Sequence, residues 1–380
     1  MTALADLPTE TIGLSFEADQ QTLLAVLEKA AYVVPSRDTL PVLKNFYIEV
    51  KPKSIFVTAT DLELSVVASS EEVAVSSPGV GVFPARKLLD IVKESDSDVS
   101  ISVSSGVATI SSGRAEWTLP LMDKSEYPSL PDIADVTLIS VDRAQFTHAI
   151  KSVAFAAAHD TVQPPLMMID VTDKKMRAAD GVRFQQIEVD DFTENLQIPI
   201  SAVDDLMKIM KSSGSDYVQV GQTETSLVFW VGDDVFLAQK SAAIFPDVTQ
   251  VLLKPALAND IDLYVDSPEL IAAIRRVRIN ADLETSSVAL RLTTDAMLVI
   301  AKDPYGSAAK EVVDTKYSGD PRTLVFNHAY LLDMLAAADS AICHFRLGKG
   351  SKTKPSPLLL VDEDTGMVGV LNQMKIDFLA

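Results

Sequence analysis

The clearest pattern in the chain is a strand-to-helix segment that occurs three times. In each copy an apolar residue precedes Pro or Asn, an Asp lies seven positions after that apolar residue, and an apolar pair follows the Asp. The copies are Phe83–Val92, Ile198–Met207 and Phe326–Leu335. The leading apolar residue is expected to end a strand, because Pro and Asn suit a helix entrance. The later apolar residues recur at helical spacing and predict one buried helix face.

A second amphipathic helix is predicted upstream of each copy, because apolar residues recur there at i, i+4 and i+7, and again at i+9. The matching positions are Leu23, Leu27, Ala30 and Tyr32; Phe146, Ile150, Val153 and Phe155; and Leu270, Ile274, Val277 and Ile279. Internal repetition therefore predicts an α+β fold of three similar domains, each with two helices packed on antiparallel sheets. The expected domains are residues 1–135 (with 1–13 a loose leader), 136–256 and 257–380.

Short runs of apolar and β-branched residues between turn residues predict the strands. They are residues 14–16, 46–50, 55–59, 64–68, 72–75, 99–103 and 107–110 in the first domain; 166–171, 182–189, 217–220 and 226–231 in the second; and 261–265, 288–292, 297–301, 324–326, 358–361 and 367–371 in the third. Hairpin turns are expected at Ser105-Gly106 and at Asp364-Thr365-Gly366. Segments 127–132 and 255–260 are expected to be linkers between domains.

Composition limits the kind of partner and the compartment. The chain has 380 residues with 33 Lys and Arg against 53 Asp and Glu, a formal charge of −20. This balance argues against attraction of the whole surface to nucleic acid or to an anionic membrane. The single Cys343 excludes an intramolecular disulfide and fits a cytoplasmic location. The sequence contains neither a signal-peptide pattern nor an apolar stretch long enough to span a membrane.

Candidate catalytic residues are few. Asp61 and Glu63 would share a face of a strand, and with Asp180 they would form the carboxylates of a metal-dependent α+β hydrolase. The pattern favours a solvated strand end instead, because no His or further carboxylate is tied to Asp61 and Glu63 by spacing. The four His residues and Cys343 show no metal-ligand spacing. We therefore expect no enzymatic activity, no cofactor and no metal site.

Basic residues gather on the repeated helices although the chain is acidic. They are Lys29, Arg86, Lys87, Lys93, Lys151, Lys208, Lys211, Arg275, Arg276 and Arg278. Positive charges without aromatic or amide residues that read bases predict binding to phosphates with little sequence preference.

Several short motifs, in order along the chain, resemble the bacterial DNA polymerase sliding clamp family, the β subunit of the replicative polymerase. The motifs are residues 37–45, 59–63, 84–91, 127–128, 179–183, 245–247 and 317–319. The resemblance covers nearly the whole chain. It implies that three DNA-clamp domains per chain form a ring as a head-to-tail homodimer around double-stranded DNA, acting as a processivity factor without chemistry. The implied protein partners are the replicative polymerase, the clamp loader and other proteins with a clamp-binding motif. A three-domain protein-binding scaffold that does not bind DNA is the other alternative.

The resemblance also assigns residues. Near DNA it places Lys29, Arg37, Lys87, Lys151, His159, Lys208, Lys211, Arg275 and Arg276. At the dimer interface it places Trp117 and Ile279. In a peptide-binding pocket between the second and third domains it places Leu166, Ala179, Gly181, Val182, Arg183, Phe184, Pro246, Gln250, Val251, Pro355, Pro357, Val370 and Met374.

Some of these positions depart from the family pattern. Val182 stands where His is common, Phe184 where Leu is common, and Gln250 where Arg is common. After Asn372–Ile376 the chain continues with Asp377–Ala380. The pattern favours a last strand with a ragged end, and the alternative is a tail that occludes its own or a neighbour's pocket.

Overall fold

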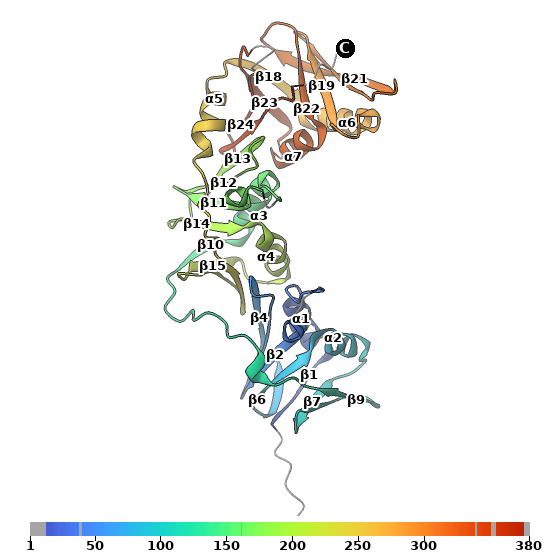
Figure 1. Cartoon of the computed structure of the whole chain (residues 1–380), viewed down its shortest axis with the longest axis vertical. Coiled ribbons are helices and arrows are strands. Elements are labelled where there is room, and N and C mark those ends of the chain that lie inside the picture. The colour runs from blue at the N-terminus through green and yellow to red at the C-terminus, as the bar shows by residue number, and fades with distance from the viewer. Residues whose placement is uncertain (1–12, 38–39, 161, 339, 351–354, 376–380) are drawn as a thin grey trace, which may run out of the picture. The chain divides into compact units, whose positions relative to one another are not determined.

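The computed structural model describes residues 13–37, 40–160, 162–338, 340–350 and 355–375. Most of the expected leader and the tail Asp377–Ala380 lie outside these ranges. The chain divides into two compact units, one of Met1–Arg143 with Asp204–Lys240 and the other of Ala144–Val203 with Ser241–Ala380. Figure 1 labels many of the elements of both units. Within the described residues, no helix is long and apolar enough to cross a membrane.

The three strand-to-helix copies are confirmed. They are β6 (Gly79–Pro84) with α2 (Ala85–Glu94), β14 (Leu196–Pro199) with α4 (Ile200–Ser212), and β22 (Arg322–Asn327) with α7 (His328–Ala338). Phe83, Ile198 and Phe326 are fully buried at the strand ends. Asn327 assists the entrance to α7, because its Oδ1 accepts hydrogen bonds from the backbone N–H groups of Ala329 and Tyr330.

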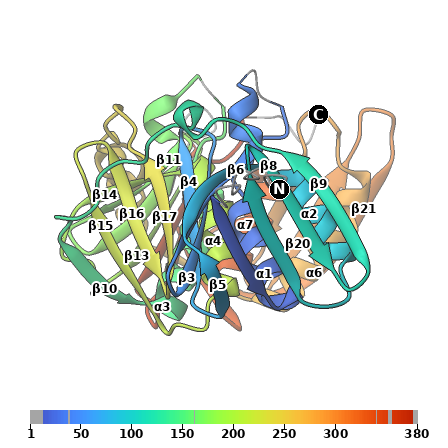
Figure 2. The same ribbon diagram turned by 90° about the horizontal axis from the view of Figure 1, so that it is seen from below.

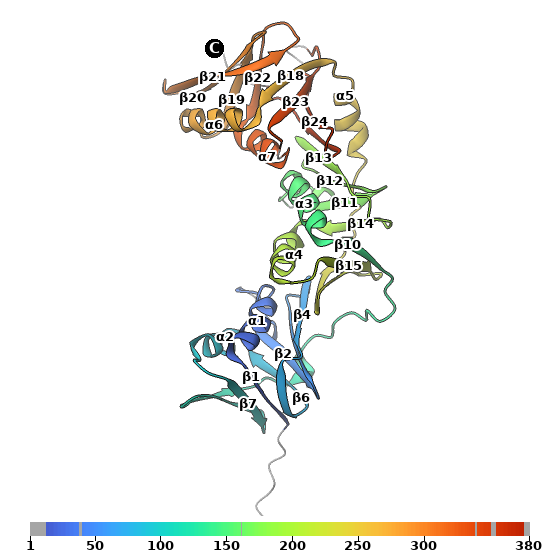
Figure 3. The same cartoon turned by 180° about the vertical axis from the view of Figure 1, so that it is seen from behind.

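The upstream helices are also confirmed, as α1 (Gln20–Ala31), α3 (Arg143–Val153) and α6 (Ser267–Val277). Asp19 caps α1 by accepting from the Thr22 N–H at 2.9 Å, and Asp266 caps α6 through the Glu269 N–H at 2.8 Å. In each unit, helices lie side by side, α1 with α2 and α6 with α7 (Figures 1 and 3).

Three antiparallel sheets carry the helices. In the first unit, the five-stranded sheet has the order β5 (Val73–Ser77), β1 (Leu14–Ala18), β7 (Val99–Ser104), β8 (Val107–Ser112), β9 (Ala115–Pro120). The eight-stranded sheet of the same unit has the order β10 (Leu138–Asp142), β15 (Tyr217–Gln222), β16 (Ser226–Val231), β17 (Asp234–Gln239), β4 (Leu64–Ser70), β3 (Ser54–Thr60), β2 (Asn45–Lys51), β6. In the second unit, the twelve-stranded sheet has the order β14, β11 (Met168–Thr172), β12 (Lys175–Ala179), β13 (Arg183–Glu188), β25 (Met367–Leu371), β24 (Leu358–Asp362), β23 (Ile342–Leu347), β18 (Ile261–Asp266), β21 (Ala308–Tyr317), β20 (Ala296–Lys302), β19 (Ser287–Leu292), β22.

Two of these sheets continue across the predicted domain boundaries. In the first unit, β17 pairs with β4, with Val235 opposite Val67, and Figure 2 shows these strands side by side. In the second unit, β13 pairs with β25, with Arg183 opposite Leu371. A strand of one predicted domain therefore forms sheet hydrogen bonds with a strand of the next predicted domain. No sequence pattern predicts these pairings, and the division into three domains stays a prediction.

The expected linker 255–260 requires a correction. Its first residues belong to a short helical segment, a π-helical turn η5 (Thr249–Leu253) that continues into α5 (Lys254–Leu257). Leu252, Leu253 and Ala256 are buried and share one helical face. Pro255 stands in the first turn of α5, directly after the π-helical turn η5.

Candidate functional site

Part of the predicted peptide-binding set meets in one apolar cluster of the second unit, which we call the linker cluster. It consists of Ala158, Leu166, Ala179, Phe184, Val248, Leu252, Leu253, Ala256, Leu359 and Val370. Leu166, Ala179, Phe184 and Val370 had been assigned from the sequence, and each is at most 6% exposed. The segment η5–α5 supplies the members Leu252, Leu253 and Ala256, and β12, β13, β24 and β25 or their flanks supply most of the rest.

Exposed apolar residues adjoin this cluster in the chain. Val182 is 43% exposed in the turn between β12 and β13, and Val251 is 72% exposed on η5. Gly181, Pro246 and Gln250 are exposed as well. An apolar centre with exposed apolar neighbours and few polar groups suits the side chains of a bound peptide.

The turn that presents Val182 is held by Asp180. One carboxylate oxygen of Asp180 accepts hydrogen bonds from the backbone N–H groups of Val182 and Arg183, both at 2.9 Å. Gly181 has a φ of +87°, a conformation that a residue with a Cβ adopts only under strain. The local sequence Asp-Gly-Val-Arg therefore fixes the backbone conformation of the turn that carries Val182.

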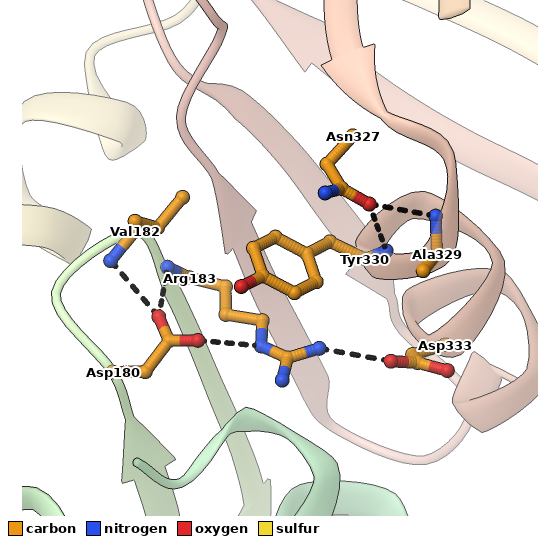
Figure 4. A network of polar contacts seen from close by, with 7 residues as sticks. All are labelled: Asp180, Val182, Arg183, Asn327, Ala329, Tyr330 and Asp333. Carbon is orange, nitrogen blue, oxygen red and sulfur yellow. Dashed lines mark hydrogen bonds and ion pairs between the residues drawn. The ribbon is translucent and has the colours of Figure 1, made fainter. Parts of the chain in front are cut away.

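Arg183 lies at the centre of a polar network that joins β13 to α7 (Figure 4). Its Nε donates to Asp180 Oδ2 and its Nη1 to Asp333 Oδ2, each at 2.9 Å. The guanidinium carbon lies 4.1 Å from the ring centroid of Tyr330 and 5.4 Å from that of Phe155. Arg183 is only 7% exposed. Its guanidinium thus has internal partners on several sides, so we assign Arg183 to the support of the site rather than to direct peptide contact.

A second polar network, which no sequence motif indicates, holds the start of η5. Arg177 Nε donates to Asp170 Oδ2 at 2.7 Å, and Arg177 Nη1 donates to Thr249 Oγ1 at 3.4 Å. Asp170 and Arg177 stand opposite each other on β11 and β12. The only available sequence signal was this pair of opposite charges in neighbouring strands, and no pattern links them to Thr249.

Other residues assigned to the pocket lie apart from the linker cluster. Met374 packs with Ala289, Val325 and Ile300, and its backbone N–H donates to the Val325 carbonyl at 2.8 Å. The carbonyl of Pro357 accepts from Asn259 Nδ2 at 2.9 Å, and Pro355 is half-buried nearby in the sequence. The structure therefore does not bring Met374 together with Leu166, Ala179, Phe184 and Val370.

Several of the basic helix residues already have carboxylate partners. Lys29 Nζ lies 2.7 Å from Oδ2 of the buried Asp234. Lys208 Nζ lies 2.7 Å from Asp205 Oδ1, and this hydrogen bond raises the pKa of Lys208. The guanidinium of Arg276 pairs with both oxygens of Glu311, which raises the pKa of Arg276. These cations are less available to DNA phosphates than the sequence suggested.

Another group of assigned cations is exposed and forms no ion pair with a carboxylate of the described residues. It consists of Lys87, Lys151, Lys211 and Arg275. Arg37 and His159 are exposed in loops. Each unit contributes to the exposed group from its own helices, Lys87 and Lys211 in the first and Lys151 and Arg275 in the second.

The residues assigned to the dimer interface lie near open sheet edges. Trp117 is half-buried on β9, the terminal strand of the five-stranded sheet, opposite Ile110 of β8. Ile279 is 83% exposed in the turn η6 (Arg278–Asn280), which follows α6. In the same unit, residues 308–314 of β21 pair with β20, and only residues 315–317 pair with β18. Among the described strands, β9 and the first part of β21 each leave one side without a partner.

The carboxylates of the alternative hydrolase have structural partners. Asp61 Oδ1 accepts from the backbone N–H groups of Glu63 at 2.9 Å and Leu64 at 2.6 Å, and so closes a turn. Asp180 pairs with Arg183 as described. Over the described ranges, no group of three His, Cys, Asp or Glu residues could hold a metal ion. The hydrolase alternative is therefore not supported. Cys343 is buried, and burial raises the pKa of its thiol.

Comparisons with known proteins agree with this geometry. Residues 14–131 match the model for the N-terminal domain of the DNA polymerase III beta subunit, and residues 256–368 match that for its C-terminal domain. The chain is 27% identical over 334 residues to the beta sliding clamp of Proteus mirabilis, covering 85% of this chain and 90% of the relative. It is 26% identical over 334 residues to the beta sliding clamp of Escherichia coli, with the same coverage.

Solved structures show the same fold. The Caulobacter crescentus beta sliding clamp matches with a TM-score of 0.88 at 23% identity, covering 96% of this chain and 99% of that one. The DNA polymerase III subunit beta of Pseudomonas aeruginosa matches with a TM-score of 0.86 at 25% identity, covering 95% and 99%.

Proposed function

The chain belongs to the DNA polymerase III beta subunit family, the sliding clamps, and we propose that as a processivity factor it closes a ring around duplex DNA. The observation that carries this proposal is the threefold repeat of paired helices with exposed Lys and Arg residues. The proposed domains are residues 1–135, 136–256 and 257–380, and the bounds of the two family models, 14–131 and 256–368, support them. The protein catalyses no reaction, and we place its action in the cytoplasm.

Sliding requires weak contacts that are not specific for sequence. The exposed cations can pair with phosphates; they are Lys87, Lys151, Lys211 and Arg275. Only Arg275 has a planar group, its guanidinium, that could stack on a base. A net charge of −20 over the whole chain repels DNA from surfaces where these cations are absent. A closed ring holds DNA by topology, so these few contacts are sufficient and permit movement.

The ring is proposed to form from two chains joined head to tail. Two different open edges, β9 in one unit and the first part of β21 in the other, suit a heterologous junction in which unlike surfaces meet. Trp117 and Ile279 would supply apolar contacts beside these edges.

The linker cluster is proposed to receive peptides from the replicative polymerase, the clamp loader and other proteins with a clamp-binding motif. Its support is the exposed Val182 and Val251 next to a fully apolar centre. Because Val182 and Gln250 replace residues common in the family, the preferred peptide is expected to rely more on apolar than on charged contacts.

The decisive experiment is retention on DNA. With a clamp loader supplied, the protein is expected to stay on nicked circular plasmid and to leave when the plasmid is cut. Equal retention on both forms would contradict encirclement, and no retention on the circle would favour the scaffold without DNA.

A matched pair of variants tests the subunit junction in the same assay. Ile279→Asp is expected to lose retention, because a charge replaces an apolar contact. Ile244→Asp changes a residue that is equally exposed, at 80%, and has no assigned role, and it is expected to behave as the unmodified chain.

A further inference from the structure

The loop of residues 348–350, which we call the lysine loop, is attached to the end of α5, whose buried face belongs to the linker cluster. Asn259 follows α5, and its Nδ2 donates to the Pro357 carbonyl at 2.9 Å. Ser356 Oγ donates to Asn259 Oδ1 at 2.8 Å and accepts from the Gly348 N–H at 3.2 Å. Asn259 is only 6% exposed, so these hydrogen bonds are internal. They join the lysine loop to the linker cluster.

Glycine on both sides of Lys349 allows this close packing. A Cβ on Gly348 would collide with Asn259 Oδ1 and with Ser356 Oγ, and a Cβ on Gly350 would lie 2.7 Å from the Ser356 backbone nitrogen. The loop can therefore pack against Asn259 and Ser356 only with glycine at these two positions. Lys349 extends from a closely held backbone, and its side chain is exposed.

The last described residues pass on the other side of Ser356. Gln373 Nε2 donates to the Ser356 carbonyl at 2.5 Å, and the Asn372 N–H donates to the carbonyl of Val182, the exposed residue of the turn in Figure 4, at 3.0 Å. Lys375 is exposed and lies three residues beyond Asn372, at most about 11 Å along the chain. Hydrogen bonds thus connect the Val182 turn, through residues 372–373 and Ser356, to the lysine loop.

Lys349 and Lys375 are exposed cations beside an apolar site. Neither forms an ion pair with a carboxylate in the part of the chain that the structure describes. The chain as a whole has a charge of −20, so two unpaired cations next to Val182 are a local departure from its acidic surface. The carboxylates of a bound partner would pair with them.

We propose that Lys349 and Lys375 form a basic rim that binds acidic residues of a partner peptide while its apolar side chains occupy the linker cluster. This rests on the proposed peptide site and specifies the partner's chemistry, an apolar motif flanked by Asp or Glu. Val182 and Val251 offer only apolar contacts, so the motif supplies most of the affinity. The rim raises the association rate and makes binding depend on salt.

Fluorescence anisotropy with two pairs of labelled synthetic peptides tests the rim on the full chain. All four contain the core Gln-Leu-Ala-Leu-Phe, whose large apolar side chains suit the linker cluster. One pair has three Asp or three Asn before the core, and the other pair has them after it. In one pair the Asp peptide is expected to bind roughly 2- to 25-fold more tightly at low salt, because each of two exposed ion pairs contributes up to about fivefold. This advantage should disappear at about 1 M salt.

Charge variants identify the cations. Lys349→Gln combined with Lys375→Gln is expected to abolish the advantage of the Asp peptide and to leave the affinity for the Asn peptide within about twofold. The matched control, Lys174→Gln with Lys175→Gln, changes the net charge equally at the other end of β12 from the Val182 turn, and it should keep the advantage. Lys349→Arg with Lys375→Arg should keep it as well. Circular dichroism melts report whether each variant folds.

The outcomes separate the rim from the peptide site. Equal affinities for Asp and Asn peptides in the unmodified chain, or an Asp advantage that survives in the folded Gln variant, would overturn the rim and leave the peptide site standing. Failure of all four peptides to bind would refute the peptide site itself. A single-stranded oligothymidylate that displaces the Asp peptide as well as unlabelled Asp peptide does would assign the lysines to nucleic acid and overturn the rim.

Discussion

Replacing Arg183 by Met removes the charge at the centre of the network in Figure 4 and keeps a side chain of similar length. The carboxylates of Asp180 and Asp333 then lose their cation. The Asp180 side chain is 13% exposed and that of Asp333 is 45% exposed, so the uncompensated charge falls mainly on Asp180. We expect this variant to destabilise the second unit strongly.

The magnitude follows from the environment of each partner. Removing one member of a buried ion pair costs about 3–5 kcal/mol. The half-exposed pair with Asp333 contributes less than about 1 kcal/mol, because water screens it. Asp180 retains its hydrogen bonds from the N–H groups of Val182 and residue 183, which moderates the penalty. We therefore expect Arg183→Met to lower the free energy of unfolding by about 3 kcal/mol.

Urea unfolding measured together with hydrogen exchange tests this value. Hydrogen exchange is needed because a chain with two compact units need not unfold in one step, and peptides from β13 and α7 report the unit concerned. Asp333→Asn is the matched control, with an expected loss of about 1 kcal/mol or less. If Asp333→Asn destabilised these peptides as much as Arg183→Met, the burial argument for Asp180 and Arg183 would be refuted.

Two other predictions concern charge. Arg275→Gln should reduce the slope of log affinity against log salt for duplex DNA by about 0.9 per contact removed, whereas Arg276→Gln should leave it nearly unchanged because Glu311 already pairs with Arg276. Fluorescence anisotropy measures both slopes, and equal reductions would contradict the distinction. Burial, with a smaller effect of Arg278, lowers the pKa of His328 below its ordinary 6.5. Stability should therefore be full above pH 6.5 and fall as the pH drops through the folded pKa; His328→Gln should flatten this fall in urea midpoints, and an unchanged fall would refute it.

The helices were predictable because their signals are local. The spacing of Leu23, Leu27 and Ala30, and its repeats, gave each first helix a buried face, and the strand-to-helix copies gave the second helices. The strands β9, β10, β12, β17, β21 and β23 were missed. In β9 and β21 many side chains are exposed, so apolar alternation is weak there. The pairing of β4 with β17 was beyond reach, since no local pattern records which distant strand a sheet edge meets.

The residues of the candidate site also differ in how far the sequence predicts their environment. The apolar character of Leu166, Ala179, Phe184 and Val370 was visible, and the fold collects them in the linker cluster; peptide binding there stays a proposal. Charge partners were less predictable. Asp180 lies three residues from Arg183, but Asp333 lies 150 residues away, and Lys29 and Asp234 are 205 residues apart. A sequence shows which cations exist and not which are already neutralised.

The pairing of β4 with β17 has a consequence during synthesis. Ser69 of β4 and Asp234 of β17, which share a hydrogen bond, are separated by 165 residues, so at about 5–20 residues per second the ribosome needs on the order of 10–30 s to supply the missing strand. During that interval Leu64–Ser70 is an exposed edge strand of an incomplete sheet, and it can pair with a strand of another nascent chain. Slower translation of this stretch of messenger RNA would lengthen the exposure and raise the demand for chaperones.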